Sequence, residues 1–289
     1  MTTAGKTTTA AYRSDDVETQ YAAGRSASFA YRRFGPKGRT PLVLCMRFRG
    51  TIDHWDPALL QALSNEREVI VFDNAGVGYS SGTTPPTVAE MADGALEFID
   101  ALGLSTVDLL GWSMGGFIAQ TVALARPGLV RRLIVAGSGP GRVPDMPATP
   151  DKVLAIMAKQ ESDDEDVLYL FFPETDDARE AGIASLRRLD TRLAESQSAV
   201  SAQVGDAQLA AVTAFGTGVW DRLPDLEMPV LVANGAHDVM INSFASYAMS
   251  QRLPHAKLVL YSDAGHGFLF QHYAGFANEV LDFLDDEQP

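Results

Sequence analysis

The chain has 289 residues, of which 46% are hydrophobic and 21% are charged, so it can bury one large core or two modest ones. Its 23 lysines and arginines are outnumbered by 37 aspartates and glutamates, which gives a net charge of -14. Such a charge repels a nucleic-acid backbone and an anionic membrane surface. We therefore expect neither nucleic acid nor a membrane as a partner.

The N-terminal stretch is rich in threonine and has no apolar segment of the kind found in a signal peptide, and no run in the chain reaches the length of a membrane span. The motif G-K-T-T-T begins at Gly5, too close to the chain start for a phosphate-binding loop. The single cysteine, Cys45, cannot form an intrachain disulfide and is expected in the core. We expect a cytoplasmic protein with a loose N-terminal lead-in.

Short apolar runs alternate along the chain with longer segments of helical period. Several of the runs are apolar on both faces, which is typical of a parallel sheet covered by helices. The predicted strands are 28–35, 41–46, 68–73, 107–112, 132–138, 229–235 and 257–263, and the predicted helices include 87–102, 114–127 and 267–286. The sequence predicts an α/β protein with a mostly parallel central β-sheet flanked by helices.

This alternation stops between residues 140 and 224, where no strand pattern is evident. Amphipathic segments bounded by proline- and glycine-rich turns fit that stretch instead; they are 151–160, 164–174 and 176–193. We expect one core domain formed by residues 1–139 and 225–289, with residues 140–224 inserted as a helical cap, or lid.

Residues 111–115 read G-W-S-M-G and join a predicted strand to a predicted helix. This G-x-S-x-G pattern is that of a nucleophile elbow, a turn so sharp that only small residues fit two positions before and after the serine. The turn strains Ser113, points its hydroxyl away from the sheet, and places the Met114 N–H at a helix N-terminus, where negative charge is favoured. A glycine-rich turn that happens to hold a serine is the alternative, and the strand-turn-helix context argues against it.

With this motif the chain resembles the α/β-hydrolase superfamily across nearly its whole length, as a cap-bearing serine hydrolase. The stretch 73–82, D-N-A-G-V-G-Y-S-S-G, is similar to the family turn D-x-x-G-x-G-x-S. A dinucleotide-binding interpretation of these glycines fails, because Ser81 stands where a third glycine is needed and no helix begins there. The resemblance implies that Asp73 and the glycines are structural.

A serine nucleophile needs a base, and the base needs a carboxylate that orients it. The family order is serine, acid, histidine. Asp238 follows a late predicted strand, three residues after Gly235, and His266 follows the last predicted strand, at the start of the final helix. The resemblance therefore implies a catalytic triad of Ser113, Asp238 and His266 at one edge of the sheet.

The other four of the five histidines compete for the role of base. We expect His54 to make a hydrogen bond at a helix start, His237 to adjoin the acid and line the site, and His255 to lie in a connecting turn. His272 falls within the last predicted helix, where it would pack or face solvent. Asp263, the competing acid, is expected to brace its own turn.

Acyl transfer places negative charge on the former carbonyl oxygen, which an oxyanion hole of two N–H donors stabilises. Met114 supplies one donor. In the family the other comes from a His-Gly-x loop after the third strand, and this alignment puts Met46 at the histidine, Arg47 at the glycine and Phe48 at the donor position. The chain departs from the family here, since arginine adopts positive φ less freely than glycine.

Two interpretations of Arg47 and Arg49 stay open. Either guanidinium could pair with a substrate carboxylate or stack on an aromatic group. Alternatively, both could lock the loop by bonding backbone carbonyls or the nearby acids Asp53 and Asp73. The expected substrate contacts are Arg47, Trp112 and Met240, and ring side chains are expected to complete the pocket, namely Phe48, Tyr169, Phe171, Phe172 or Trp220.

A mostly apolar pocket favours an acyl, aryl or lactone group over a sugar or a highly charged molecule. We therefore predict a serine hydrolase that cleaves a small, largely apolar ester or lactone through an acyl-enzyme, as a serine esterase or lactonase, without metal or organic cofactor. Serine argues against the dehalogenase and epoxide-hydrolase branches, which use aspartate here. Carbon-carbon bond hydrolysis, enol-lactone hydrolysis and cofactor-free perhydrolysis share the triad, and a ligand-binding protein of this fold stays open.

Overall fold

The protein is described by a computed structural model over residues 16–159, 161–198 and 200–286, so the G-K-T-T-T segment lies outside the described residues. One sheet of eight strands has the order β1-β2-β4-β3-β5-β6-β7-β8. The pairs β1-β2 and β2-β4 are antiparallel, and all other neighbours are parallel. The strands are β1 (Gln20–Ala23), β2 (Ser28–Phe34), β3 (Leu42–Cys45), β4 (Val69–Phe72), β5 (Val107–Trp112), β6 (Val130–Ala136), β7 (Val230–Gly235) and β8 (Ala256–Tyr261). The mostly parallel α/β sheet is thereby confirmed.

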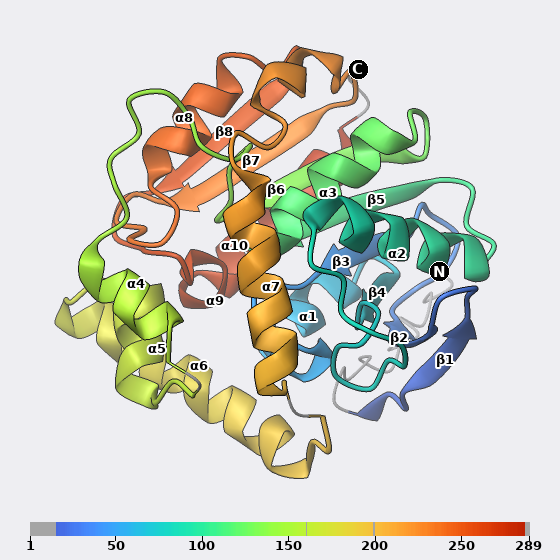
Figure 1. Ribbon diagram of the computed structural model, residues 1–289, viewed down its shortest axis with the longest axis horizontal. Helices are drawn as coiled ribbons and strands as arrows, with labels where there is room; N and C mark the ends of the chain where they lie inside the picture. Colours follow the sequence, from blue (N-terminus) through green and yellow to red (C-terminus); the bar gives the residue numbers. More distant parts are fainter. Residues whose placement is uncertain (1–15, 160, 199, 287–289) are drawn as a thin grey trace, which may run out of the picture.

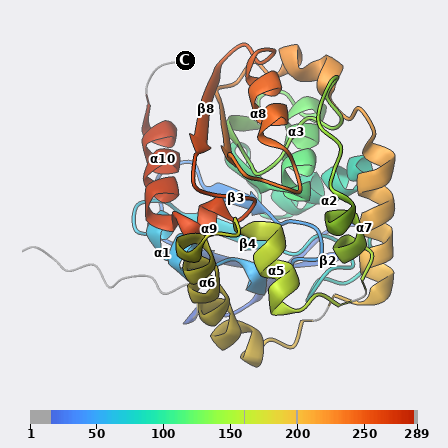
Figure 2. The ribbon, with the colours of Figure 1, turned by 90° about the vertical axis from the view of Figure 1, so that its left-hand side faces the viewer.

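The sheet lies between two helical layers, as Figure 2 shows. The pleat of each strand sends alternate side chains to opposite faces, so in β3 Leu42 and Leu44 join one core and Val43 and Cys45 join the other. On one face lie α1 (Pro57–Ser64), α9 (Phe268–Gln271) and α10 (Tyr273–Asp285), and on the other lie α2 (Val88–Ala101), α3 (Met114–Ala125) and α8 (Ser243–Ser250). Among the described residues no helix is both long and apolar enough to cross a membrane.

Two local features differ from the sequence expectations. The strand β1 was not predicted, because three of its four residues are exposed and leave no apolar pattern to read. The predicted helix 267–286 is two helices, and the break falls at His272, whose φ is -113° and ψ is 39°. The side chain of His272 is held there by Asp263, with 2.9 Å between Nε2 and Oδ1.

The described residues between β6 and β7 contain helices but no strand. The predicted helices are present as α4 (Asp151–Met157), α5 (Asp164–Phe171) and α6 (Asp176–Glu195), and α7 (Ala202–Phe215) and a 3-10 helix, η3 (Trp220–Asp225), follow them. We call α4 to α7 the inserted helices. In Figure 1, α4, α5 and α6 lie together beside α9 at one end of the sheet, and α7 crosses in front of it.

Two buried carboxylates attach α6 to the core. Asp56 caps α1 by accepting from Ala58 N at 2.9 Å, and it also binds Ser185 and Arg188 of α6, with 2.6 Å to Arg188 Nη2. Three residues earlier, Asp53 accepts from Arg32 of β2 at 2.7 Å and from Arg192 of α6 at 2.9 Å. Since both aspartates belong to the segment that follows the 46–50 loop, this segment connects the sheet to the inserted helices.

Asp53→Asn tests the strength of this attachment. Burial raises the pKa of Asp53, but hydrogen bonds from Ser196, Arg32 and Tyr79 and the charge of Arg32 outweigh it and lower the pKa to about 2. A carboxylate whose pKa is lowered by folding stabilises the protein above its ordinary pKa, and that stability is lost as the pH falls toward 2. We expect Asp53→Asn to lower the free energy of unfolding by about 3 kcal/mol at pH 7, and the deficit to shrink at pH 3, as measured by urea denaturation.

The matched control is Asp225→Asn, which makes the same chemical change in an exposed ion pair, Arg222 with Asp225, at 2.9 Å. Exposed pairs contribute little, so its unfolding free energy should stay within about 0.5 kcal/mol of the wild-type value. Equal deficits for the two variants would contradict the anchoring role of Asp53.

Candidate active site

Ser113 lies at a strained position between β5 and α3, with φ 57° and ψ -124°. Both flanking glycines are required by close backbone contacts. A Cβ on Gly111 would lie 2.2 Å from the carbonyl oxygen of Gly115, and a Cβ on Gly115 would lie 2.0 Å from the carbonyl oxygen of Cys45. The G-x-S-x-G pattern therefore reflects an elbow pressed against the end of β3.

The acid and the base predicted from the sequence are in contact. Asp238 follows β7 and His266 follows β8, and His266 Nδ1 lies 2.7 Å from Asp238 Oδ2 with both side chains buried. The other oxygen of Asp238 accepts hydrogen bonds from the backbone N–H groups of Met240 and Ile241, each at 2.8 Å. Because both oxygens of the carboxylate are engaged, it can hold the imidazole in one orientation.

His266 is also held by aromatic side chains. Its carbonyl accepts from Trp112 Nε1 at 3.2 Å, and its ring lies 5.7 Å from the Trp112 ring and 5.6 Å from the Phe171 ring, centroid to centroid. His266 Nε2 is buried and has no hydrogen-bond partner among the described residues. With Nδ1 protonated toward Asp238, Nε2 carries a lone pair that can accept a proton.

Ser113 lies at the end of β5, the residue after Trp112, on the same carboxyl edge of the sheet as His266. The structure brings Asp238 and His266 together, but it has no hydrogen bond between Ser113 Oγ and His266 Nε2. Catalytic hydrogen bonds are commonly long or absent without substrate. The three roles assigned from the sequence stay predictions that this geometry permits.

The two predicted oxyanion donors belong to neighbouring segments. Gly115, the residue after Met114, packs against the Cys45 and Met46 carbonyls, which brings the 46–50 loop up to the elbow. Neither the Phe48 N–H nor the Met114 N–H donates to another group of the described residues. The loop departs from its sequence expectation in one respect. The residue with positive φ is Arg49, at 52°, and not Arg47.

The two arginines have different surroundings. Arg49 ties the loop to the inserted segment, because its Nη1 donates to the Lys159 carbonyl and its N–H donates to Gln208 Oε1 at 2.8 Å. Arg47 Nη1 donates to the Phe48 carbonyl at 2.7 Å, while its buried Nε has no partner. The backbone carbonyls expected as loop-locking partners are thus present, but the expected acids are not.

Those acids, Asp53 and Asp73, bind elsewhere. Asp73 accepts from Ile52 N at 2.8 Å and from Tyr79 N at 3.0 Å, so it joins the 73–82 turn to the segment after the 46–50 loop. A Cβ on Gly78 would lie 2.3 Å from Asp73 Oδ2, so only glycine fits at this position. Burial raises the pKa of Asp73 to about 7 although its two backbone donors lower it.

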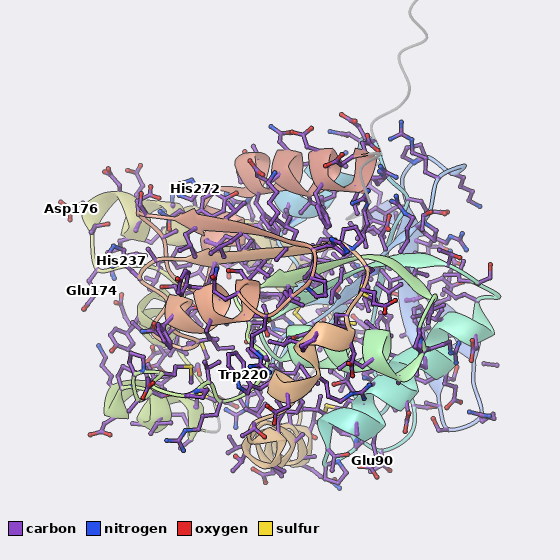
Figure 3. The ribbon with its side chains drawn as sticks, turned by 90° about the horizontal axis from the view of Figure 1, so that it is seen from above. Glu90, Glu174, Asp176, Trp220, His237 and His272 are labelled. Atoms are coloured by element: carbon purple, nitrogen blue, oxygen red, sulfur yellow. The ribbon has the colours of Figure 1, made fainter. Side chains whose placement is uncertain are left out.

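A pocket of about 560 Å³ adjoins Asp238. Its walls include Met240 and His237 from the loop after β7, with Tyr169, Phe172 and Glu174 from the inserted segment. Figure 3 shows His237 beside Glu174. The predicted contact Met240 and the rings of Tyr169 and Phe172 therefore lie at a cavity next to the acid.

The other predicted pocket residues lie elsewhere. Trp112 is fully buried behind His266, so it supports the base in this structure rather than facing the cavity, and its contact with substrate stays a prediction. Trp220 does not line this pocket, because it is far from Glu174 in Figure 3, and Arg252 lies over its ring at 4.5 Å.

The expectation for His54 is confirmed, because it forms a capping box with Thr51 at the start of a 3-10 helix, η2 (Ile52–His54). Burial first, and then the charge of Arg47, lowers the pKa of His54 to about 3.

Two further residues position the site and were not identified from the sequence. Ser138 Oγ donates to the Ser113 carbonyl at 2.7 Å and holds the elbow from below. Gln208 of α7 binds the 46–50 loop from 159 residues away in the chain. The run G-S-G-P-G after β6 is a local signal for Ser138, whereas nothing near Gln208 in the sequence indicates its distant partner.

Residues 40–273 match the sequence model of a family described as alpha/beta hydrolase fold. A solved structure similar to this chain is an alpha/beta hydrolase fold protein from Chitinophaga pinensis. It is 40% identical, its TM-score is 0.87, and the match covers 94% of this chain and 98% of that one. This similarity extends over both the sheet and the inserted helices.

Relatives in sequence include two proteins of very different size. The polyketide synthase ThaQ of Burkholderia thailandensis is 30% identical over 254 residues, which cover 86% of this chain but 12% of ThaQ. RutD of a Caulobacter species, whose name proposes a carbamate hydrolase, is 28% identical over 255 residues, which cover 86% of this chain and 92% of RutD. The chain thus corresponds to a small part of the synthase and to nearly all of RutD.

Gly115→Ala tests the close contact at the elbow. The added Cβ would meet the Cys45 carbonyl, which belongs to the backbone of a central strand and cannot move aside. We expect a loss of about 3 kcal/mol in the free energy of unfolding, measured by urea denaturation. The control is Gly275→Ala in α10, where a Cβ meets nothing within 4 Å and should stabilise the helix by about 0.5 to 1 kcal/mol. A neutral Gly115→Ala would contradict this account of the elbow.

Proposed function

Since the chain belongs to the α/β-hydrolase fold family, we propose that it is a serine hydrolase that cleaves a carboxylic ester or lactone of a small, largely apolar molecule. The observation that carries the proposal is the buried contact of 2.7 Å between His266 Nδ1 and Asp238 Oδ2. This contact leaves Nε2 free on the sheet edge that also presents the strained Ser113. A nucleophile, a base and an orienting acid are the groups that acyl transfer requires.

In the proposed reaction, Ser113 Oγ attacks the substrate carbonyl carbon and gives its proton to His266 Nε2. The negative oxygen that forms is held by the N–H groups of Met114 and Phe48. The bond between the carbonyl carbon and the alkoxide oxygen then breaks, and His266 gives the proton to that oxygen, which produces an acyl-enzyme and an alcohol. In a lactone the alcohol stays attached to the acyl group. Water, activated by His266 in the same way, releases the acid and restores Ser113. Asp238 holds the imidazole through Nδ1 and stabilises the imidazolium.

We further propose that residues 140–224 act as a lid over a core formed by residues 1–139 and 225–289. Phe171 of α5 supports this role, because its ring contacts that of His266 and its carbonyl accepts from Gly267 N at 2.7 Å. The inserted helices therefore exclude water from one side of the base. A water-poor site strengthens the electrostatic interactions on which the mechanism depends.

Carbamate hydrolysis is a second candidate, because RutD, which the match covers over 92% of its length, is named as a carbamate hydrolase. A carbamate carbonyl would use the same nucleophile, base and oxyanion donors. Comparing kcat/KM for a phenyl ester and the corresponding phenyl carbamate separates the two substrates. A fluorophosphonate probe, with the adduct located by mass spectrometry, distinguishes both from a non-catalytic binding protein, since a binding protein gains no adduct on Ser113.

Ser113→Ala should abolish turnover of 4-nitrophenyl esters while the protein stays folded. Loss of a nucleophile lowers kcat by about 10³-fold or more. The Ser113 hydroxyl forms no hydrogen bond with another described residue, so stability should change by less than about 0.5 kcal/mol. Steady-state kinetics and thermal denaturation measure the two effects. Near wild-type turnover by folded Ser113→Ala would rule out the covalent mechanism.

His266→Ala should remove both activity and its dependence on pH. A base must be neutral to accept the serine proton, so activity should fall when acid protonates the imidazole. The matched control is His272→Ala, which removes a ring that contacts Asp263 and Tyr261 outside the site. We expect His272→Ala to retain the wild-type pH-rate profile. Loss of the acidic limb in His272→Ala rather than in His266→Ala would show that the base is misassigned.

A further inference from the structure

Arg47 is a cation inside the protein without an anion beside it. The side chain is partly buried and its Nε is completely enclosed, yet it forms no ion pair with any described residue. One donor, Nη1, is used by the Phe48 carbonyl. Burial lowers the pKa of Arg47 to about 10, so the guanidinium keeps its charge at neutral pH. An unpaired buried charge is costly, and its presence calls for a partner from outside the chain.

The carboxylates close to this loop are already engaged. Asp53 binds Arg32 and Arg192, Asp56 binds Arg188, and Asp73 accepts from two backbone N–H groups. The neighbouring His54 is kept neutral at physiological pH by burial and by Arg47 itself, which lower its pKa to about 3. Among the described residues, Arg47 is therefore bonded to a neutral carbonyl and packed on aromatic rings, and no carboxylate forms a hydrogen bond with it.

The guanidinium shares its aromatic surroundings with the proposed base. Arg47 Cζ lies 5.5 Å from the Trp112 ring and 5.2 Å from the Phe171 ring, and the same two rings contact His266. Two consecutive residues, Arg47 and Phe48, thus contribute a cation and an oxyanion donor. An anion bound by Arg47 would therefore lie next to the loop that carries the proposed oxyanion donor.

We propose that Arg47 binds a carboxylate of the substrate, so that the protein selects esters or lactones that carry one anionic group on an otherwise apolar body. The proposal rests on the hydrolase function proposed above and specifies its substrate class. Arg47 has a forked guanidinium that can hold both oxygens of a carboxylate. The Phe48 contact occupies one hydrogen of Nη1 and orients the fork, while Nη2 and the second hydrogen of Nη1 are left for the ligand.

Turnover of a matched pair of esters tests this selectivity. The two substrates are the 4-nitrophenyl ester of hexanoic acid, which ends in a methyl group, and the mono-4-nitrophenyl ester of adipic acid, which ends in a carboxylate. We expect the wild-type protein to prefer the adipate ester in kcat/KM by roughly 10- to 100-fold, the range of a charge-assisted hydrogen bond. Arg47→Met should lose that preference through a higher KM for the adipate ester, and Arg47→Lys should keep part of it.

Arg49→Met is the matched control, because Arg49 belongs to the same loop but donates to the Lys159 carbonyl. Loosening the loop should lower kcat for both esters by a similar factor and preserve the preference. If Arg47→Met also lowered kcat equally for both esters, Arg47 would brace the loop only. The same conclusion would follow if the wild-type protein showed no preference for the anionic ester in any matched pair whose chain between the ester and the terminal group has two to six CH₂ groups. If Arg47→Met does not fold, Arg47→Lys distinguishes the two roles, because a weaker preference for the adipate ester supports the anion site and an unchanged preference contradicts it.

A binding experiment separates this proposal from the hydrolase function itself. The ketones 6-oxoheptanoate and 2-heptanone are not hydrolysed and differ in the same way, by a carboxylate against a methyl group. Calorimetry on the wild-type protein should show at least about tenfold tighter binding of 6-oxoheptanoate, and Arg47→Met should abolish the difference. If no ester is turned over but the difference depends on Arg47, the hydrolase function fails and the anion site stands. Equal binding of both ketones overturns the anion site.

Discussion

The contact of Gly115 with the carbonyl of Cys45 is the constraint on which the site depends. It is a contact of backbone with backbone, close enough that a Cβ would lie 2.0 Å from the oxygen. Because α3 can approach β3 this closely, Met114 and the 46–50 loop line a common cavity next to the elbow. The order of the sheet, which makes β3 and β5 neighbours, is what permits the contact. The strained φ of Ser113 is tolerated because the surrounding central strands are held on both sides.

The acid-base pair depends on the same architecture in a different way. Asp238 and His266 come from loops after β7 and β8, and the two strands are parallel neighbours, so their loops emerge at one edge. These loops also pack with backbone against backbone, since a Cβ on Gly235 would lie 2.2 Å from the Gly265 carbonyl oxygen. The inserted helices complete the site with Phe171 against His266. Positioning therefore comes from the sheet, and enclosure comes from the insertion.

The central strands and the elbow could be predicted from the sequence because each has a local cause. A strand buried on both faces must be apolar throughout, as β3 and β4 are, and the elbow needs glycine at fixed spacing. The features that sequence reasoning missed depend on distant partners. The break at His272 depends on Asp263 and Tyr261, and the positive φ of Arg49 accompanies its bonds to Lys159 and Gln208. The engagement of Asp53 and Asp56 with α6 likewise spans more than a hundred residues, so it leaves no periodic pattern.

The attachments between the 46–56 segment and the inserted helices have a consequence for protein engineering. Arg49, Asp53 and Asp56 are each bonded to the segment that contains Lys159, Arg188, Arg192 and Gln208. The inserted helices are therefore not a portable module. A chimera that exchanged them for those of a relative would leave two buried carboxylates facing foreign side chains and would release the loop that presents Phe48. A graft keeps these contacts intact only if residues 46–56 are transferred together with the helices, so the two segments form one unit for any redesign of the site.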